Sequence, residues 1–484
     1  MIPNNIGNNK LCFLLIYEER DILFSEDYRK EKDTLGEVQV PSDAHYGSQT
    51  QRAIDNFPIS GVRLPRSFIR AQGIIKAAAA KANMDTGSLD KKIGEAIIQA
   101  SEEVIDGKWD HQFLVDIYQA GAGTSQNMNA NEIIGNRASI LLDIPFDEKK
   151  KRVHPHDHVN MSQSTNDTFP SALNIAAVEY LVHHLLPSLK DLQTAMENKS
   201  EEFKDVLKTG RTHLHDAVPM RLGQEFSGFA ATIKESYESI HHTTDALYEL
   251  GLGGNAIGTS VNLNPDYIPN VISDIKRRTS LPFREPENLF SFMQNRNAPI
   301  RTMMALKELA IHLIKITSDL RLLSSGPRTG LYEITLPGVQ PGSTIMPGKV
   351  NPAILEMTHM VCCQIIGYET AITTAGIAGQ LEINVMMPLI AYTLLQSIEI
   401  MTNAITTLEK KCINGIKANK ENCQIWMNAS LSVVTGVSPI FGYDLASQIG
   451  KQADEENKTI RTVLEERGLL TEETKKAIDP RGMV

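Results

Sequence analysis

The chain has 484 residues, more than the roughly 250–300 that a single hydrophobic core usually supports, so two or three domains are expected. Hydrophobic residues make up 42% and charged residues 22%, a balance typical of a soluble globular protein. The net charge of −10 excludes a basic footprint for nucleic acid or an anionic membrane surface.

The N-terminal 30 residues or so form a segment of their own. The apolar run 11–17 is too short to span a membrane, and Glu18 and Glu19 follow it directly, which does not fit a signal peptide. We expect residues 1–30 to be an extension of unassigned purpose. No other stretch reaches the length of a membrane helix.

Cysteine usage indicates the compartment. The five cysteines are odd in number, and the adjacent Cys362 and Cys363 would make a poor disulfide framework. A reduced, cytoplasmic location is the simpler interpretation.

Two segments in the first third are rich in hydroxyls and amides. Residues 122–136 read A-G-T-S-Q-N-M-N-A-N-E-I-I-G-N, and residues 154–170 read H-P-H-D-H-V-N-M-S-Q-S-T-N-D-T-F-P. The side chains that stand out as neutral hydrogen-bond donors are Thr124, Ser164, Thr165 and Asn166. His154, His156 and His158 alternate, which fits either three metal ligands on a strand face or a turn around Pro155.

The middle of the chain has helical periodicity. In residues 222–250, Phe226, Ile233, Ile240 and Leu247 fall seven apart, a stripe typical of a bundle. No alternating segment of useful length predicts a strand. Long apolar-rich segments with few internal Gly or Pro occupy residues 171–205, 222–250, 299–325, 352–375 and 386–411. They predict a central helical bundle, whose second apolar faces would be buried against copies of the same chain.

Between these helices, residues 210–225 read G-R-T-H-L-H-D-A-V-P-M-R-L-G-Q-E and bring Thr212 and His213. An acidic protein that binds an acidic ligand must build positive potential locally, and the candidates for it are Arg211, Arg328 and Lys349.

Residues 342–352, G-S-T-I-M-P-G-K-V-N-P, carry the strongest functional signal. Glycines and prolines there favour a loop. Such a loop can close over a small anion and exclude water. Lys349 would pair with a carboxylate, Asn351 would orient it, and Ser343, with Thr344 beside it, would act as nucleophile or base.

These four segments, in this order, resemble the signature segments of the aspartase/fumarase superfamily, whose loop follows the pattern G-S-[ST]-x-M-P-x-K-x-N. The resemblance runs from about residue 34 to the C-terminus. It implies an all-α fold of three domains, which we place at residues 1–161, 162–420 and 421–484. It also implies a homotetramer with a twenty-helix core and active sites that are shared between subunits.

The resemblance further implies an α,β-elimination from a dicarboxylic acid that gives fumarate. Ser343 is then the general base that removes the Cβ proton, and His213 is the second catalytic residue. Preorganised donors would stabilise the aci-carboxylate that forms. The residues that would bind substrate are Thr124, Ser164, Thr165, Asn166, Thr212, Thr344, Lys349 and Asn351.

No metal or organic cofactor is expected, because the site set contains no Cys/His metal spacing, no glycine-rich phosphate cradle and no lysine in a Schiff-base context. Activation by a divalent cation is left open. Nothing in the sequence indicates a nucleic-acid or membrane partner, and the expected partner is a small dicarboxylate.

Within the family, ammonia and water are the alternative leaving groups. The A-G-T-S at residues 122–125 and A-G-Q-L-E-I-N-V-M at residues 378–386 resemble the aspartate ammonia-lyases, whereas residues 210–214 are more like the fumarate hydratases. Ile377 and Met387 stand where aspartases usually carry Glu, and His156 where the family usually has Asn. We expect an aspartate ammonia-lyase, with fumarate hydratase as the alternative.

Two acidic residues in these motifs have an open role. Glu132 and Glu225 are interpreted as buried partners of Lys349 or His213 rather than as catalysts.

Overall fold

The computed structural model of the chain describes residue 25, residues 27–144 and residues 152–484. It divides into two compact units, one of residues 1–184, 241–306 and 366–399, the other of residues 185–240, 307–365 and 400–484. Most of the expected extension, residues 1–24 and 26, lies outside the described residues. The three-domain division stays a prediction.

The fold is predominantly helical, as expected, and the long helices match the predicted segments. Residues 171–205 are covered by α5 (Thr165–Tyr180), a turn η4 (Leu181–Leu185) and α6 (Leu186–Glu202). The other four segments correspond to α7 (Leu222–Leu247), α10 (Asn297–Leu323), α11 (Ala353–Ile377) and α12 (Met387–Lys411). These four contribute residues to both units. The heptad-spaced Phe226, Ile233, Ile240 and Leu247 are all fully buried.

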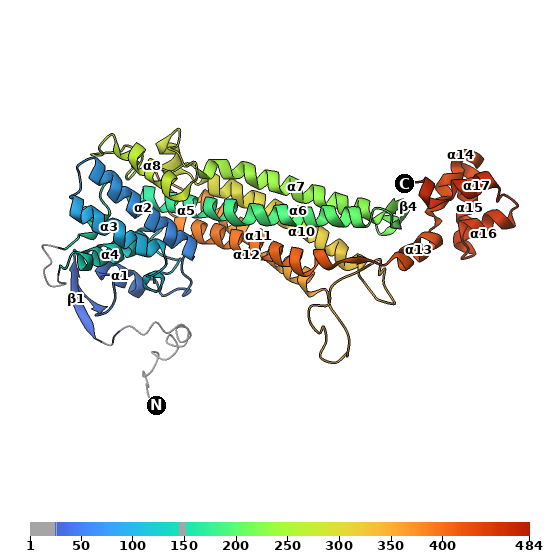
Figure 1. Cartoon of the computed structure of the whole chain (residues 1–484), viewed down its shortest axis with the longest axis horizontal. Coiled ribbons are helices and arrows are strands. Elements are labelled where there is room, and N and C mark those ends of the chain that lie inside the picture. The colour runs from blue at the N-terminus through green and yellow to red at the C-terminus, as the bar shows by residue number, and fades with distance from the viewer. Residues whose placement is uncertain (1–24, 26, 145–151) are drawn as a thin grey trace, which may run out of the picture. The chain divides into compact units, whose positions relative to one another are not determined.

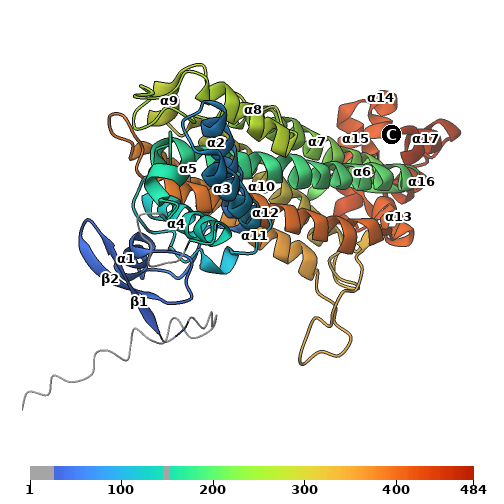
Figure 2. The same ribbon diagram turned by 60° about the vertical axis from the view of Figure 1, so that its left-hand side comes forward.

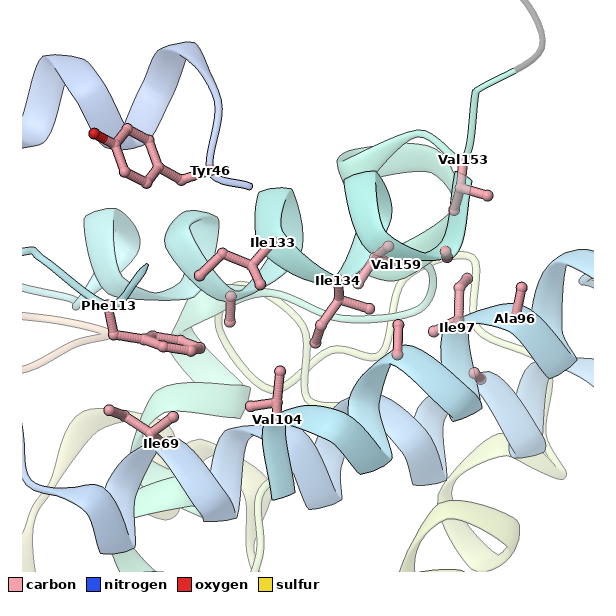
Figure 3. Packing of buried hydrophobic residues seen from close by; sticks show 14 of the residues in the cluster. Tyr46, Ile69, Ala96, Ile97, Val104, Phe113, Ile133, Ile134, Val153 and Val159 are labelled. Carbon is pink, nitrogen blue, oxygen red and sulfur yellow. The ribbon is translucent and has the colours of Figure 1, made fainter. Parts of the chain in front are cut away.

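The first unit is built around an alanine-rich helix. It contains α1 (Ser48–Asn56), α2 (Arg66–Asp85), α3 (Lys91–Ile105), α4 (Thr124–Leu141), α8 (Tyr267–Thr279) and α9 (Leu289–Gln294), with turns η2 (Asp110–Gln112) and η3 (Pro155–Val159). Alanine favours helix and has a small side chain, so α2 can pack closely against α3, α5 and α8 (Figure 1). Figure 3 shows the core between α3 and α4, where Ile97, Val104, Ile133 and Ile134 meet.

The second unit ends in a cluster of short helices. These are α13 (Lys420–Ala429), α14 (Ser438–Phe441), α15 (Tyr443–Glu455), α16 (Ile460–Glu466) and α17 (Glu472–Ala477), with turns η5 (Ile413–Gly415), η6 (Leu431–Val437) and η7 (Pro480–Gly482). Their apolar side chains form a separate small core that includes Val437, Ile449, Ile460 and Val463. Among the residues that the structure describes, no helix is long and apolar enough to cross a bilayer.

Three short antiparallel pairs of strands were not expected from the sequence. β1 (Tyr28–Asp33) pairs with β2 (Gly36–Pro41) beside α1, as Figure 2 shows. β3 (Leu207–Thr212) pairs with β4 (His215–Arg221), and β5 (Ile334–Thr335) with β6 (Lys417–Ala418). The sequence did not indicate these three short strand pairs, although the predominantly helical fold is as expected. The β1 sequence, Y-R-K-E-K-D, lacks apolar alternation, and β2, G-E-V-Q-V-P, alternates over too few residues to predict a strand.

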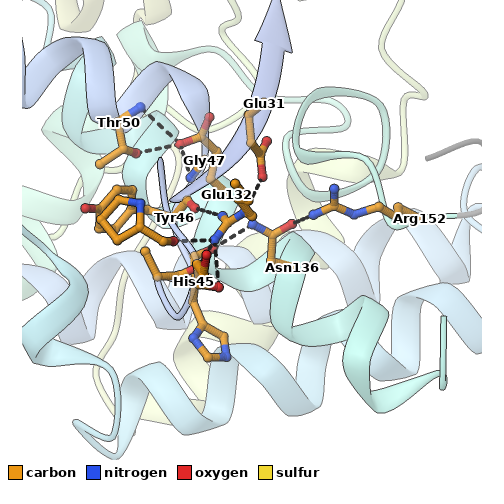
Figure 4. Close-up of polar contacts among 12 residues, drawn as sticks. Glu31, His45, Tyr46, Gly47, Thr50, Glu132, Asn136 and Arg152 are labelled. Carbon is orange, nitrogen blue, oxygen red and sulfur yellow. Dashed lines mark hydrogen bonds and ion pairs between the residues drawn. The ribbon is translucent and has the colours of Figure 1, made fainter. Parts of the chain in front are cut away.

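The start of α1 is held by a side chain of another helix. Gly47 at its N-cap has no side chain, and the carboxylate of Glu132 on α4 accepts hydrogen bonds from the backbone N–H groups of Gly47 and Thr50 at 2.9 and 3.0 Å (Figure 4). The Gln49 backbone N–H donates to the same carboxylate at 2.9 Å. The Thr50 hydroxyl donates to the same carboxylate at 2.6 Å. Glu132 thus replaces the missing cap and joins α1 to α4. Glu132 is buried, as interpreted, and its described hydrogen bonds go to the start of α1, whereas a pairing with Lys349 or His213 stays a prediction.

Candidate active site

In the first unit, the N-termini of α4 and α5 lie against each other. Thr124 is the first residue of α4, and the preceding Gly123 has a left-handed φ of +80°. A Cβ on Gly123 would lie 2.0 Å from the ring of Phe169 on α5. Only glycine permits both this backbone conformation and this close approach.

The first turn of α5 is fixed by its own polar side chains. Ser164 is the N-cap, and its hydroxyl accepts a hydrogen bond from the Asn166 backbone N–H at 3.2 Å. Asp167 accepts from the Ser164 backbone N–H at 3.1 Å, which completes a capping box. Asn166 donates through its amide to the carbonyl of Ala256 at 2.9 Å.

Thr165 is linked to α4 by an amide. Asn127, one turn after Thr124 on α4, donates through Nδ2 to the Thr165 hydroxyl at 3.1 Å. The structure therefore brings together four predicted site residues, Thr124, Ser164, Thr165 and Asn166, at two adjoining helix N-termini. Such ends favour anions, because their first backbone N–H groups have no intrahelical partner.

A buried lysine lies behind this group and was not predicted. Lys76 on α2 is 1% exposed, and its ammonium donates to the side-chain oxygens of Asn127, Asn160 and Gln163 at 2.9, 3.1 and 2.9 Å. Burial lowers the pKa of Lys76 to about 7, against a smaller opposing effect of Asp167. In the sequence, Lys76 stands directly before four alanines in an apolar segment. This pattern alone does not predict a buried cation, because the partners of Lys76 lie on other elements.

Asp167 is equally buried and ties a loop to α5. Its second carboxylate oxygen accepts from the backbone N–H groups of Gly253 and Asn255 at 3.2 and 2.9 Å. Burial raises the pKa of Asp167 to about 7, although these backbone hydrogen bonds act in the opposite direction. The loop at residues 253–256 is thereby fixed beside Ser164 and Asn166.

In the second unit, the Gly342–Asn351 loop is closed at its neck. The Gly342 N–H donates to the Lys349 carbonyl at 2.7 Å, and the Asn351 amide donates to the Gly342 carbonyl at 2.6 Å. A Cβ on Gly342 would lie 2.6 Å from the Asn351 backbone nitrogen, so the neck requires glycine. Asn351 therefore closes the loop through a direct backbone contact.

The hydroxyl of Ser343 is surrounded by backbone donors. It accepts hydrogen bonds from the N–H groups of Met346 at 3.0 Å and Ile345 at 3.3 Å. Donors of this kind favour a charged oxygen over a neutral hydroxyl. Thr344 and Lys349 are exposed on the same loop, and Ile345 is 83% exposed.

Thr212 and His213 lie at the tip of the β3–β4 hairpin, also in the second unit. His213 and Leu214 form its two-residue turn, and both have left-handed φ values, 55° and 62°. Such turns usually contain Asn or Gly, so this tip is strained. The tip is exposed, and Leu214 is 74% exposed.

The base of the hairpin carries a buried ion network. Glu333, which is fully buried, pairs with Lys208 at 3.0 Å and with Arg211 at 2.9 Å, and Lys208 also pairs with Glu225 at 2.7 Å. Arg211 is therefore neutralised within the chain and is not an available cation for a ligand, contrary to expectation. The described partner of Glu225 is Lys208, and its pairing with Lys349 or His213 stays a prediction. Arg328 is exposed.

His156 and His158 lie in one helical turn, η3, and His154 is its N-cap, so the alternative of a strand with three metal ligands was wrong. The His154 ring accepts from the Asp157 N–H at 3.1 Å, and the His158 ring accepts from the His154 N–H at 2.9 Å. His156 lies 2.7 Å from the Gln49 amide, and its burial, followed by the nearby His154, lowers its pKa. Within the described ranges, no group of three or more His, Cys, Asp or Glu residues is arranged to hold a metal ion.

Two segments that distinguish the leaving-group alternatives contact each other in the first unit. The Gly121 carbonyl accepts from the Met387 N–H at 3.0 Å, and a Cβ on Gly121 would lie 1.9 Å from the Val385 carbonyl oxygen. Gly121, which directly precedes the stretch 122–125, therefore contacts Val385 in the stretch 378–386 and Met387 just after it. Met387 is buried at the start of α12, and Ile377 is exposed at the end of α11.

Known proteins resemble this chain over most of its length. The family model described as Lyase matches residues 36–367, and the model described as Fumarase C C-terminus matches residues 433–484. An aspartate ammonia-lyase from a Bacillus species is 45% identical over 449 residues, which cover 92% of this chain and 95% of the relative. Fumarate hydratase 2 of Arabidopsis thaliana is 44% identical over 452 residues, covering 93% of this chain and 90% of the relative. The crystal structure of class II fumarase from Schistosoma mansoni matches with a TM-score of 0.92 at 36% identity, covering 94% of this chain and 99% of that one.

Proposed function

The chain belongs to the aspartase/fumarase superfamily of lyases, and from this premise we propose that it converts L-aspartate reversibly to fumarate and ammonia. Lyases of this superfamily need no organic cofactor. Activation by a divalent cation stays a prediction.

Ser343 is the proposed base. Its oxygen takes the Cβ proton, and the electron pair of that C–H bond is first held by the adjacent carboxylate as the aci-carboxylate. This electron pair then forms the C=C double bond, while the C–N bond breaks and its electron pair leaves on nitrogen as ammonia. The two N–H groups that donate to the Ser343 hydroxyl support this role, because they lower the cost of a charged oxygen.

The carboxylates are proposed to bind at donors on the helix N-termini, the loop and the hairpin. The helix N-termini that carry Thr124, Ser164, Thr165 and Asn166 supply hydroxyl, amide and backbone donors, which suits the dianionic aci-carboxylate formed when the proton leaves. Lys349, Asn351 and Thr344 on the loop, with Thr212 on the hairpin, would hold the substrate beside Ser343.

The contact between residues 121 and 385–387 is the observation that carries the choice of ammonia. Gly121, directly before the first aspartase-like stretch, contacts Val385 in the second, so the two stretches are neighbours beside Thr124, although Met387 at the same contact departs from the aspartase pattern.

Fumarate hydratase is the second candidate, because relatives of that name are equally similar. A hydroxyl leaves poorly without a proton from an acid such as His213, whereas an ammonium needs little assistance. The exposed position of His213 at a strained turn is compatible with such an acid.

Incubation of the purified protein with L-aspartate, and separately with L-malate, distinguishes the two. We expect fumarate absorbance and released ammonia from aspartate, and far slower or no reaction with malate. Rapid interconversion of malate and fumarate, with no ammonia from aspartate, would replace the proposal by the hydratase.

We also propose a homotetramer in which one subunit's hairpin completes another subunit's site. The exposed apolar side chains Leu214, Val218 and Ile345, close to His213 and Ser343, support burial against another copy. Mixed tetramers of Ser343→Ala and His213→Ala subunits should regain part of the activity that each variant lacks. Demonstrated mixing without recovery would exclude shared sites.

A cytoplasmic location is proposed with this function. Cys362, Cys363, Cys412 and Cys423 are free, and three of them are buried, as expected for a protein that is kept reduced.

A further inference from the structure

A cavity of about 270 Å³ lies in the first unit, where α9 ends and α10 begins. Figure 2 labels α9 in this region. Its walls include Asn174, Glu249, Glu287, Arg296, Ala298 and Arg301, none of which belongs to the proposed active site. The cavity therefore requires an explanation of its own.

Arg296 is a buried cation without a carboxylate partner among the described residues. The residue is 4% exposed, and its one described hydrogen bond runs from Nη2 to the Met293 carbonyl at 2.5 Å. The buried Nε has no hydrogen-bond partner, and the guanidinium lies 5.5 Å from the centre of the Phe292 ring. Burial alone lowers the pKa of Arg296 to about 10. A buried charge without a counter-ion is costly, so this position favours the binding of an anion.

The N-terminus of α10 faces the same cavity. Asn297, Ala298 and Pro299 form its first turn and line the wall beside Arg296. The first backbone hydrogen bond recorded here runs from the Ile300 N–H to the Arg296 carbonyl at 3.2 Å, so the N–H groups of Asn297 and Ala298 have no intrahelical acceptor. Unsatisfied N–H groups and the helix dipole of this 27-residue helix favour a negative group at this end.

Two acidic residues also line the cavity, and their negative charge limits which ligands can bind there. Glu249, which pairs with Arg284 at 3.7 Å, and the exposed Glu287 line the wall together with Arg296 and Arg301. Two acidic groups oppose a multiply charged anion such as phosphate. They suit a ligand that carries a cation as well as a carboxylate.

We propose that this cavity binds a small zwitterionic α-amino acid, with Arg296 and the first N–H groups of α10 holding its carboxylate and Glu249 and Glu287 attracting its ammonium. The site is separate from the catalytic groups and is independent of which leaving group the enzyme uses.

Glycine is the probe, because it has both charges and no side chain that the proposed active site would recognise. Thermal unfolding and titration calorimetry of the intact protein would be followed with increasing glycine, acetate, methylamine and inorganic phosphate. We expect a saturable rise in Tm with glycine, a weaker rise with acetate and none with methylamine.

Two variants remove the site in different ways. Arg296→Met removes the buried charge, and Ala298→Asp supplies a carboxylate from the chain itself. We expect both to unfold at the same or a higher temperature than the wild type without ligand, and to lose the response to glycine. Arg321→Gln, an exposed site near the other end of α10, is the matched control and should keep the full response.

Three outcomes would overturn the proposal. The wild type could show no response to glycine. Phosphate could stabilise it more than glycine, in a manner lost in Arg296→Met, which would replace the ligand class. Alternatively, Arg296→Met could change the sedimentation of the protein with no glycine response in the wild type, which would assign the missing counter-ion to another copy of the chain.

Discussion

The helix ends that carry Thr124 and Ser164–Asn166 differ sharply from the loop and hairpin that carry Ser343 and His213. The helix ends are supported from behind by Lys76, Asn127 and Asp167, all buried and hydrogen-bonded. The loop and the hairpin tip are exposed and held mainly by their own backbone. The side chains at the helix ends are therefore preorganised by the core, whereas those of the loop and the hairpin tip can be substituted without disturbing the core. Substitutions in the first region should affect both stability and activity, and substitutions of exposed side chains on the loop that carries Ser343 should affect activity with little change in stability.

The largest effect is expected at the proposed base. Ser343→Ala should lower kcat by about 10²–10⁴, the usual contribution of a proton-transfer group. The Tm should stay within about a degree of the wild type, because the hydroxyl bonds only to N–H groups of an exposed loop. Steady-state kinetics and calorimetry measure both quantities. Activity within a factor of a few of the wild type would reduce Ser343 to a turn residue.

Two lysines provide a direct comparison of the regions. Lys76→Met should lower the free energy of unfolding by about 2–4 kcal/mol, because three amide oxygens lose a charged donor. It should also raise KM, since Asn127 positions Thr165. Lys349→Met should raise KM without a loss of stability. Urea unfolding and kinetics of both variants test this, with Lys81→Met, an exposed lysine of α2, as the control. Equal stabilities of the two variants would remove the distinction between the regions.

The buried pair should also make stability depend on pH. The pKa of Asp167 is raised from 3.8 to about 7, so its stabilising contribution is full below 3.8 and is lost as pH rises through about 7. The pKa of Lys76 is lowered from 10.5 to about 7, so its contribution is full above 10.5 and is lost as pH falls through about 7. Together they produce a minimum of stability near pH 7, with slopes of at most about 1.4 kcal/mol per pH unit.

Asp167→Asn should flatten the acid side of that minimum and Lys76→Met the alkaline side. Urea unfolding at several pH values measures both slopes, with Asp319→Asn on the surface of α10 as a control. Unchanged slopes in both variants would mean that these groups do not titrate near neutral pH.

The smallest effect is expected at the strained turn. The free energy of unfolding of Leu214→Gly should be about 1 kcal/mol higher than that of Leu214→Ala, because glycine adopts the left-handed conformation without strain. Both variants should weaken subunit association equally if Leu214 packs against another copy. Chemical unfolding and sedimentation of the two variants separate strain from contact. No difference in stability between them would show that the turn is unstrained.

The long helices and the Gly342–Asn351 loop could be predicted because their signals are local. Phe226, Ile233 and Ile240 repeat at a helical period, and glycine and proline mark the loop. The β3–β4 hairpin could not be predicted, because Lys208 and Arg211 owe their burial to Glu333, more than a hundred residues away. The same reason applies to Lys76 and Glu132: their partners lie on other elements, and a single sequence does not show which distant residues meet.

The network around Glu333 also has a consequence for the order of folding. Lys208 and Arg211 on the hairpin are paired with a shared counter-ion only after Glu333 has packed against them. The backbone carbonyl of Glu333 in turn accepts hydrogen bonds from Asn419 and Cys423, about ninety residues further along the chain. Contacts between such distant segments form slowly, because a long loop must close before any of them is made. The hairpin that carries Thr212 and His213 should therefore acquire its final structure late, after the local helices, and the enzyme should become active only in that last step.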